Sequence, residues 1–147
     1  MNLKKLFRPK KLAIIGGYWA DFVYDENIKI GFNGELWHIN PKRKSSKQKK
    51  YYKNIADLPA IPDCVYIAVS SDLTIKLMND ISNMGAGGAV CLASRFSELN
   101  TKKGKEKTNQ LILNSKKTPF LGPNCYGFIN YFDKVSVWSD QVAGSQI

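Results

Sequence analysis

Short, continuous apolar runs recur along this chain, and polar stretches long enough for helices separate them. The runs are unbroken rather than alternating, which is typical of strands that helices cover on both faces. Strand and helix then alternate, an order that favours a parallel sheet with right-handed crossovers. We therefore predict an α/β fold with a doubly wound, mainly parallel sheet, and we expect strands at residues 12–15, 36–39, 64–69, 89–93 and 119–121.

The segment between the third and fourth runs has the strongest helical pattern. Ser71 and Asp72 supply a start with an early acidic residue, and Gly85 is placed to end the helix. Between them, apolar residues recur at the spacing of one helix face, at Leu73, Leu77, Ile81 and Met84. Weaker patterns predict two further helices, over residues 20–30 and 105–117.

The length and composition fit one globular domain. A chain of 147 residues with 44% apolar residues is long enough to bury a single core. No apolar run reaches the roughly 18 residues of a membrane span, and no secretory signal follows the basic N-terminus, so we expect a cytoplasmic protein without membrane contact. After Tyr131 the chain is short on organised pattern, and it stops at Ile147 as if inside another element, which favours a fragment.

The cysteines and the single histidine offer little chemistry. Cys64, Cys91 and Cys125 are far apart, and two of them lie in apolar runs, so we expect reduced core thiols. With only His38 and no paired motif, we predict no metal site. His38 lies in a predicted strand and is interpreted as structural, and Cys125 has no base near it in the sequence. We therefore predict no catalytic residue in this chain.

The chain is strongly basic. Its formal net charge of +10 at pH 7 brings nucleic acid into consideration, because clustered lysines and arginines release counterions from phosphates. However, lysine far outnumbers arginine, and base reading in a duplex relies on arginine. We expect residues 42–53 to form a loop that closes over an anionic ligand, and a second basic cluster lies at Lys102, Lys103, Lys105 and Lys107.

Two strand ends carry residues that suit a phosphate. The first predicted strand ends in Gly16 and Gly17, where backbone N–H groups and a helix N-terminus can face an anion; a tight turn alone would also explain these glycines. The second ends in Asn40, Pro41 and Lys42, without the acidic residue that binds the ribose of NAD. A cation there suits a phosphorylated adenosine, such as NADP or coenzyme A.

Several motifs occur in the order and spacing of a known module. Residues 6–16 read LFRPKKLAIIG, residues 39–42 read INPK and residues 121–127 read LGPNCYG. With GFNG at 31–34 and IADLP at 55–59, the chain resembles the N-terminal CoA-binding domain of the NDP-forming acyl-CoA synthetases. That superfamily includes ADP-forming acetate–CoA ligase and the succinyl-CoA synthetase α subunit. The resemblance covers residues 5–141.

The resemblance implies a Rossmann-like fold that holds coenzyme A at the carboxyl ends of the strands. The implied contacts come from the turns after the first, third and fourth strands and from the lysine after the second, namely Gly16, Gly17, Tyr18, Trp19, Lys42, Val69, Ser70, Ser71, Ser94 and Arg95. Tyr18 and Trp19 are bulkier than the small residues of family members, and they either stack on adenine or narrow the pocket. Arg95 either pairs with a phosphate or faces solvent.

The resemblance also implies a division of labour between domains. Residues 1–147 then form a single CoA-binding domain, the N-terminal fragment of a longer protein. The downstream domains hold a phosphorylated histidine and the ATP or ADP, and the whole protein forms an acyl-CoA from a carboxylate, CoA and ATP. The expected partners are CoA or acyl-CoA and those domains. The alternative is a stand-alone regulatory domain that senses CoA or NAD(P)H, and a nucleic-acid binder is the least favoured reading.

Overall fold

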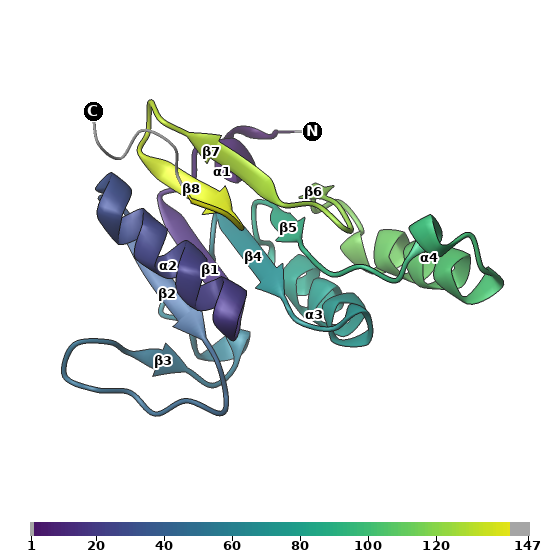
Figure 1. The fold of residues 1–147 in the computed structure, drawn as a ribbon, viewed down its shortest axis with the longest axis horizontal. Helices are drawn as coiled ribbons and strands as arrows, with labels where there is room; N and C mark the ends of the chain where they lie inside the picture. Colours follow the sequence, from purple (N-terminus) through teal and green to yellow (C-terminus); the bar gives the residue numbers. More distant parts are fainter. Residues whose placement is uncertain (1, 142–147) are drawn as a thin grey trace.

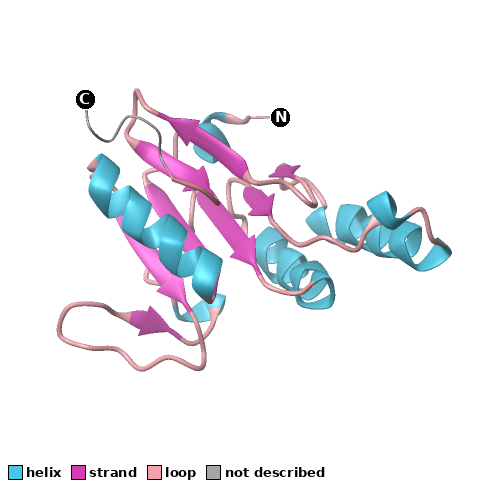
Figure 2. Cartoon of the chain, viewed as in Figure 1, coloured by secondary structure: helices cyan, strands magenta, loops and turns pink. Residues whose placement is uncertain are grey.

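The computed structural model describes residues 2–141 and shows a six-stranded parallel sheet with helices packed against it (Figures 1 and 2). All neighbouring strand pairs in this sheet run parallel, and the order reverses between the two central strands. The predicted doubly wound α/β fold is therefore confirmed. In spatial order the strands are β3 (Tyr51–Tyr52), β2 (Glu35–Ile39), β1 (Lys11–Gly16), β4 (Cys64–Ala68), β5 (Ala89–Cys91) and β6 (Phe120–Leu121).

Alternate residues of β1 enter two separate cores. Leu12 and Ile14 lie in one core, and Ala13 and Ile15 lie in the other, because successive side chains of a strand point to opposite faces. This double burial explains why the strand reads as an unbroken apolar run. One core is covered by α1 (Lys4–Phe7), α2 (Tyr18–Ile30) and an antiparallel pair, β7 (Gly127–Asn130) and β8 (Val135–Trp138). The other is covered by α3 (Ser71–Met84) and α4 (Lys102–Ser115), with 3-10 turns at Ile55–Asp57 and Ser97–Leu99.

The helix α3 has the predicted extent and a buried face that differs in part from the predicted one. Its N-cap is Ser70, whose hydroxyl accepts a hydrogen bond from the Leu73 N–H, and Gly85 ends it in the left-handed region at φ 81°. The expected stripe began at Leu73, but this side chain is 42% exposed. The face buried in the core consists of Thr74, Ile75, Met78 and Ile81. Ile81 belongs to both the predicted and the observed face, and Leu77 and Met84 pack partly buried against the same core. Leu73 is the residue of the predicted stripe that lies outside this core.

The hairpin β7–β8 corrects the expectation that no regular element follows Tyr131. Val135 and Val137 are fully buried against the α2 side of the sheet. The buried amide of Asn27 on α2 donates from Nδ2 to the Ser136 carbonyl at 2.6 Å, and its Oδ1 accepts from the Ser136 N–H at 2.9 Å. Asn27 therefore pairs with β8 as a neighbouring strand would. The expected break near Ile147 lies outside the described residues.

The state of the cysteines agrees with the prediction of reduced core thiols for two of the three. All three cysteines are free; Cys64 and Cys91 are buried, whereas Cys125 is half-buried. Burial raises the pKa of the Cys91 thiol to about 12 and also raises the pKa of the Cys64 thiol, which keeps both groups protonated. Within residues 2–141, no helix combines the length and the apolar character needed to cross a membrane.

Candidate functional site

A cavity of about 440 Å³ opens at the carboxyl edge of the sheet, where β1, β2 and β4 end. Its walls combine strand ends, the start of the loop after β2 and one face of α3. Four of the ten predicted contact residues line it: Gly16, Gly17, Lys42 and Val69. Asn40 and Lys53, from the strand end and the loop that the sequence analysis singled out, also line the cavity. Sequence reasoning missed the rest of the wall, which includes Asn54, Ile55, Leu73, Leu77 and Asp80. The cavity therefore has an apolar interior and a polar rim.

The turn after β1 needs glycine for steric reasons and leaves a helix end open. Gly16 has φ +138°, and a Cβ atom there would lie 2.4 Å from the Ala68 carbonyl oxygen on β4. Gly17 is the N-cap of α2 and supplies no side-chain cap. The first turn of a helix has N–H groups without intrahelical partners, and they favour an anion when no side chain caps them. This turn can therefore accept a phosphate.

The carbonyl group of Gly16 is fixed from β2. The His38 ring atom Nε2 lies 3.0 Å from the Gly16 oxygen, and Asn40 donates to the same oxygen from Nδ2 at 2.9 Å. Asn40 also accepts from the Lys42 N–H at 3.0 Å, which orders the start of the following loop. His38 is completely buried, and burial lowers the pKa of its imidazole. The predicted position of His38 in a strand is confirmed, and its complete burial agrees with a structural histidine.

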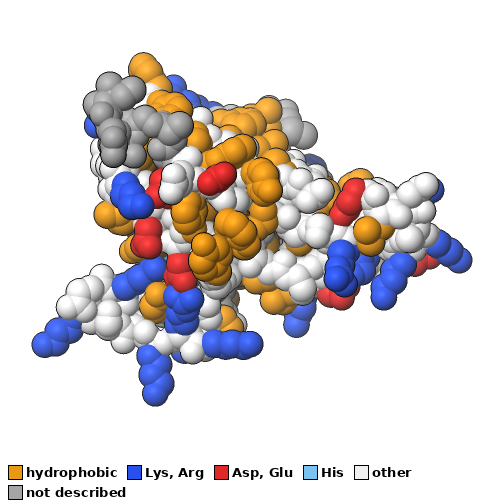
Figure 3. All heavy atoms as spheres, viewed as in Figure 1, with side chains coloured by type: hydrophobic (Ala, Val, Ile, Leu, Met, Phe, Trp, Pro, Cys, Tyr) orange, Lys and Arg blue, Asp and Glu red, His pale blue; other side chains and the backbone are white. Residues whose placement is uncertain are grey.

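Residues 41–50, which we call the basic loop, connect β2 to β3 and project from the lower left of the molecule in the view of Figures 1 and 3. Two salt bridges bind this loop to α2, because Arg43 Nη2 lies 2.5 Å from Asp21 Oδ2 and Lys49 Nζ lies 3.5 Å from Asp21 Oδ1. The Lys49 ammonium also lies 3.9 Å from the ring centre of Tyr24. Lys53 donates to the Pro41 and Arg43 carbonyls at 2.9 Å. The loop is thus held closed at its base.

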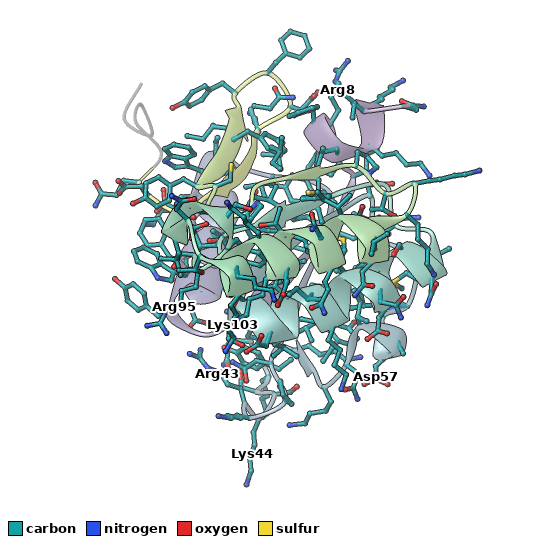
Figure 4. The ribbon with its side chains drawn as sticks, turned by 90° about the vertical axis from the view of Figure 1, so that its right-hand side faces the viewer. Arg8, Arg43, Lys44, Asp57, Arg95 and Lys103 are labelled. Atoms are coloured by element: carbon teal, nitrogen blue, oxygen red, sulfur yellow. The ribbon has the colours of Figure 1, made fainter. Side chains whose placement is uncertain are left out.

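Lys42 differs from the other cations around the basic loop. Its side chain is exposed and lines the cavity. No side-chain hydrogen bond or ion pair of Lys42 occurs within the part of the chain that the structure describes, so its ammonium group is available to a ligand. Figure 4 shows Lys44, by contrast, extending away from the body of the molecule.

The turn after β4 is occupied by contacts within the protein. Ser70 caps α3, as described above, and Ser71 is buried. The Lys107 ammonium on α4 donates to the Ser71 hydroxyl at 2.8 Å and lies 2.9 Å from the Asp72 carboxylate. Lys107 lowers the pKa of Asp72 through this contact. The hydroxyl oxygens of Ser70 and Ser71 therefore each accept a hydrogen bond from within the protein, and both residues lie at the predicted edge of the sheet.

The turn after β5 and the start of α2 present exposed groups. Arg95 is exposed, adopts φ 71°, and its N–H donates to the Glu98 carboxylate. Ser94 precedes it and is also exposed. Tyr18 and Trp19 are 72% and 45% exposed, and their rings pack edge to face with centroids 5.1 Å apart. None of these four residues lines the cavity, so the structure leaves them at its margin.

A second cavity, of about 870 Å³, lies at the opposite edge of the sheet, where β1 and β2 begin. It is lined by Arg8 and Asp133, whose side chains pair through Nε and Oδ2 at 2.6 Å and through Nη2 and Oδ1 at 2.9 Å. Arg8 holds the pKa of the Asp133 carboxyl below its ordinary value. No predicted contact residue lies here. Across residues 2–141, no group of His, Cys, Asp and Glu side chains is arranged to hold a metal ion.

The reversal of strand order, the glycine turn and the open helix end define a nucleotide-binding domain of the α/β class. Residues 10–131 match the CoA binding domain family, and the chain belongs to that family. The matched segment contains β1 to β6 and all residues that line the cavity of about 440 Å³.

Curated relatives place this domain within longer enzymes. The chain is 32% identical over 136 residues to the ADP-forming acetate–CoA ligase II of Archaeoglobus fulgidus, covering 88% of this chain and 20% of the relative. It is 30% identical over 133 residues to the ADP-forming acetate–CoA ligase of Methanocaldococcus jannaschii, covering 88% and 19% of the two chains. The chain therefore spans about a fifth of the length of these relatives.

Solved structures have the same fold. PH0766 from Pyrococcus horikoshii OT3 superposes with a TM-score of 0.86 at 26% identity, covering 97% of this chain and 34% of that one. The dinucleotide-forming acetyl-coenzyme A synthetase 1 of Ca. Korarchaeum cryptofilum, in its apo form, superposes with a TM-score of 0.85 at 24% identity. This second match covers 93% of this chain and 31% of the synthetase and supports the fold alone.

Proposed function

We propose that this chain binds coenzyme A at the carboxyl edge of its sheet. The observation that carries the proposal is the meeting, in one cavity, of an uncapped helix turn at Gly17 and an unpaired cation at Lys42. Coenzyme A carries a pyrophosphate and a 3′-phosphate, and these groups need both N–H donors and positive charge. The open turn suits the pyrophosphate, and Lys42 suits the 3′-phosphate.

The apolar wall of the cavity suits the adenine ring. Ile55, Leu73 and Leu77 offer surfaces on which a flat ring can pack, and Asp80 and Asn54 at the rim offer acceptors for its amino group. We assign Ser94, Arg95, Tyr18 and Trp19 to the path of the pantetheine arm, because they lie outside the cavity at the same edge. Ser70 and Ser71 shape the turn after β4 rather than donate to the ligand.

We further propose that the chain is the CoA-binding module of an acyl-CoA synthetase of the ADP-forming type. Its relatives are ligases of about five times its length, and the chain belongs to the CoA binding domain family. In this proposal the carboxylate, ATP and phosphohistidine steps belong to downstream domains. The module contributes the thiol substrate in a fixed orientation.

The test is calorimetric titration with coenzyme A, 3′-dephospho-CoA and NADH. We expect saturable binding of coenzyme A with a stoichiometry of about one, since the chain forms one site. Losing the 3′-phosphate or replacing Lys42 by alanine removes one charge-assisted contact, so each should weaken binding about tenfold. Lys44→Ala is the matched control, because Lys44 lies in the same loop and outside the cavity.

The outcomes separate the alternatives. Equal weakening by Lys42→Ala and Lys44→Ala would mean that the loop acts only through general charge. Tighter binding of NADH than of coenzyme A would support a regulatory dinucleotide-sensing domain and contradict the proposal.

A further inference from the structure

The side chains of His38 on β2 and of Asn40, which directly follows β2, converge on one backbone oxygen of the glycine turn. His38 Nε2 and Asn40 Nδ2 lie 3.0 Å and 2.9 Å from the Gly16 carbonyl oxygen. The Asn40 N–H donates to the Tyr52 carbonyl on β3, so the chain stays paired for one residue beyond β2. His38 and Asn40 are alternate residues of this extended stretch, and both side chains therefore reach the end of β1 from the same side. Gly16 has φ +138°, and because glycine has no side chain, contacts from neighbouring residues must hold this conformation.

The position of the imidazole fixes which ring nitrogen carries the proton. A carbonyl oxygen only accepts hydrogen bonds, so Nε2 must be the protonated atom. Nδ1 is buried without a hydrogen-bond partner in the described part of the chain, and it lies 3.7 Å from the Asp21 carboxylate, which is also an acceptor. The Asp21 charge is in turn offset by Arg43 and Lys49.

The surroundings keep this ring in place. The side chain is completely buried, the Tyr24 ring is stacked with its centroid 5.9 Å away, and the Tyr51 ring lies at 4.9 Å. A buried ring packed between two aromatic side chains has little freedom to turn. The donor at Nε2 is therefore aimed permanently at the Gly16 oxygen.

We propose that His38 is a positioning residue for phosphate binding. In its neutral form, with the proton on Nε2, it holds the Gly16–Gly17 peptide in the orientation that presents the first turn of α2 to an anion. The peptide bond is planar and trans, so its N–H points away from the direction of its carbonyl oxygen. Fixing the Gly16 oxygen toward β2 therefore fixes the direction of the Gly17 N–H. This inference rests on the proposed binding of coenzyme A at that turn.

The experiment compares three variants of the chain. His38→Phe keeps a flat ring and removes the donor, whereas His38→Gln restores an N–H near the position of Nε2. Leu111→Ala is the stability control, because Leu111 is buried in α4 and lines neither cavity. The readouts are the dissociation constant for coenzyme A, the melting temperature, and the NMR resonances of the Gly16 carbonyl, the Gly17 amide and the imidazole nitrogens.

We expect His38→Phe to weaken coenzyme A binding about tenfold, the upper end for one lost hydrogen bond. The Gly16 carbonyl and Gly17 amide resonances should move in the same variant without ligand. His38→Gln should bind within about threefold of the unaltered chain, and Leu111→Ala should lower the melting temperature with little change in affinity. The nitrogen spectrum should show a protonated Nε2 and a bare Nδ1.

Two results would overturn the inference: a proton on Nδ1, or unmoved Gly16 and Gly17 resonances in His38→Phe. An affinity loss no larger than that of Leu111→Ala would also reduce His38 to a packing residue. If the unaltered chain binds no coenzyme A, the proposed function fails. The Gly16 carbonyl and Gly17 amide resonances of the ligand-free protein, compared with those of His38→Phe, then still decide whether His38 fixes the orientation of the Gly16–Gly17 peptide.

Discussion

Asp21 on α2 and Arg43 in the basic loop form a two-pronged ion pair, with Nη2–Oδ2 at 2.5 Å and Nη1–Oδ1 at 2.6 Å. The contact joins the helix that begins at the glycine turn to the loop that carries Lys42. Two parallel contacts to one carboxylate restrict direction as well as distance. The proposed pyrophosphate and 3′-phosphate contacts are thereby held in a fixed spatial relation.

Asp21→Asn should loosen the basic loop without unfolding the domain. The pair is partly exposed, with 26% and 39% of the two side chains accessible, so we expect a stability loss of about 1 kcal/mol or less. Hydrogen exchange of the Tyr51 and Tyr52 amides should become faster. Asp25→Asn, an exposed change on the same helix, is the control, and equal exchange in both variants would contradict the anchoring role.

The stability of the domain should fall as the pH is lowered below about 6.5. Burial lowers the pKa of His38 from the ordinary value of 6.5, so the unfolded chain binds this proton more readily than the folded one. The stabilising contribution is fully present above the unfolded pKa and is lost as the pH falls toward the folded pKa.

His38 is the only histidine in the chain, which makes this window simple to assign. Urea unfolding at several pH values between 5 and 7.5 measures the slope. His38→Gln should remove most of it, and an unchanged slope in that variant would place the proton elsewhere.

Gly16→Ala should destabilise the domain much more than Gly17→Ala, although the two glycines are adjacent in the same turn. The added methyl group at Gly16 would meet the Ala68 carbonyl at 2.4 Å in a positive-φ conformation, which we expect to cost about 3 kcal/mol. At Gly17 no atom lies within 4 Å of the added Cβ. Thermal denaturation should give a melting temperature for Gly16→Ala well below that for Gly17→Ala. The opposite order would show that the turn relaxes to accept the methyl group at position 16.

Asn27→Ala should release the hairpin β7–β8 from α2. The change leaves the Ser136 N–H and carbonyl buried without the amide that pairs them, and we expect a loss of about 3 kcal/mol. Asn109→Ala on the exposed side of α4 is the control. Urea unfolding followed by the fluorescence of the three tryptophans, of which Trp138 lies on β8, measures the effect, and equal midpoints for the two variants would contradict it.

The main sheet could be predicted because its central strands are buried on both faces. Residues such as Ala13 and Ile14 enter different cores, and this leaves an unbroken apolar run in the sequence. The strand β3 has only two residues, and it pairs with β2 where Tyr51 packs beside His38. Such a strand depends on tertiary contacts, and no local pattern predicts it.

The part of the candidate site that lies at strand ends could be predicted from the sequence. The part formed by one face of α3 could not. Gly16, Gly17, Lys42 and Val69 follow strand ends, and parallel strands bring their ends to one edge. Leu73 and Leu77 were identified only as part of an apolar helix face; both line the cavity, and Leu77 also packs against the core. Helical spacing identifies an apolar face and does not distinguish a face turned to the core from one turned to a pocket.

The sheet has two-residue strands at both of its edges, β3 and β6. Unpaired edge strands allow sheets to pair edge to edge into larger sheets or fibrils, and very short edge strands disfavour this pairing. Lysines also flank β3 on both sides, at Lys50 and Lys53, and their charge repels an approaching copy. Both edges of the main sheet are therefore poor templates for another strand, so copies of this domain at high local concentration should resist joining through this sheet.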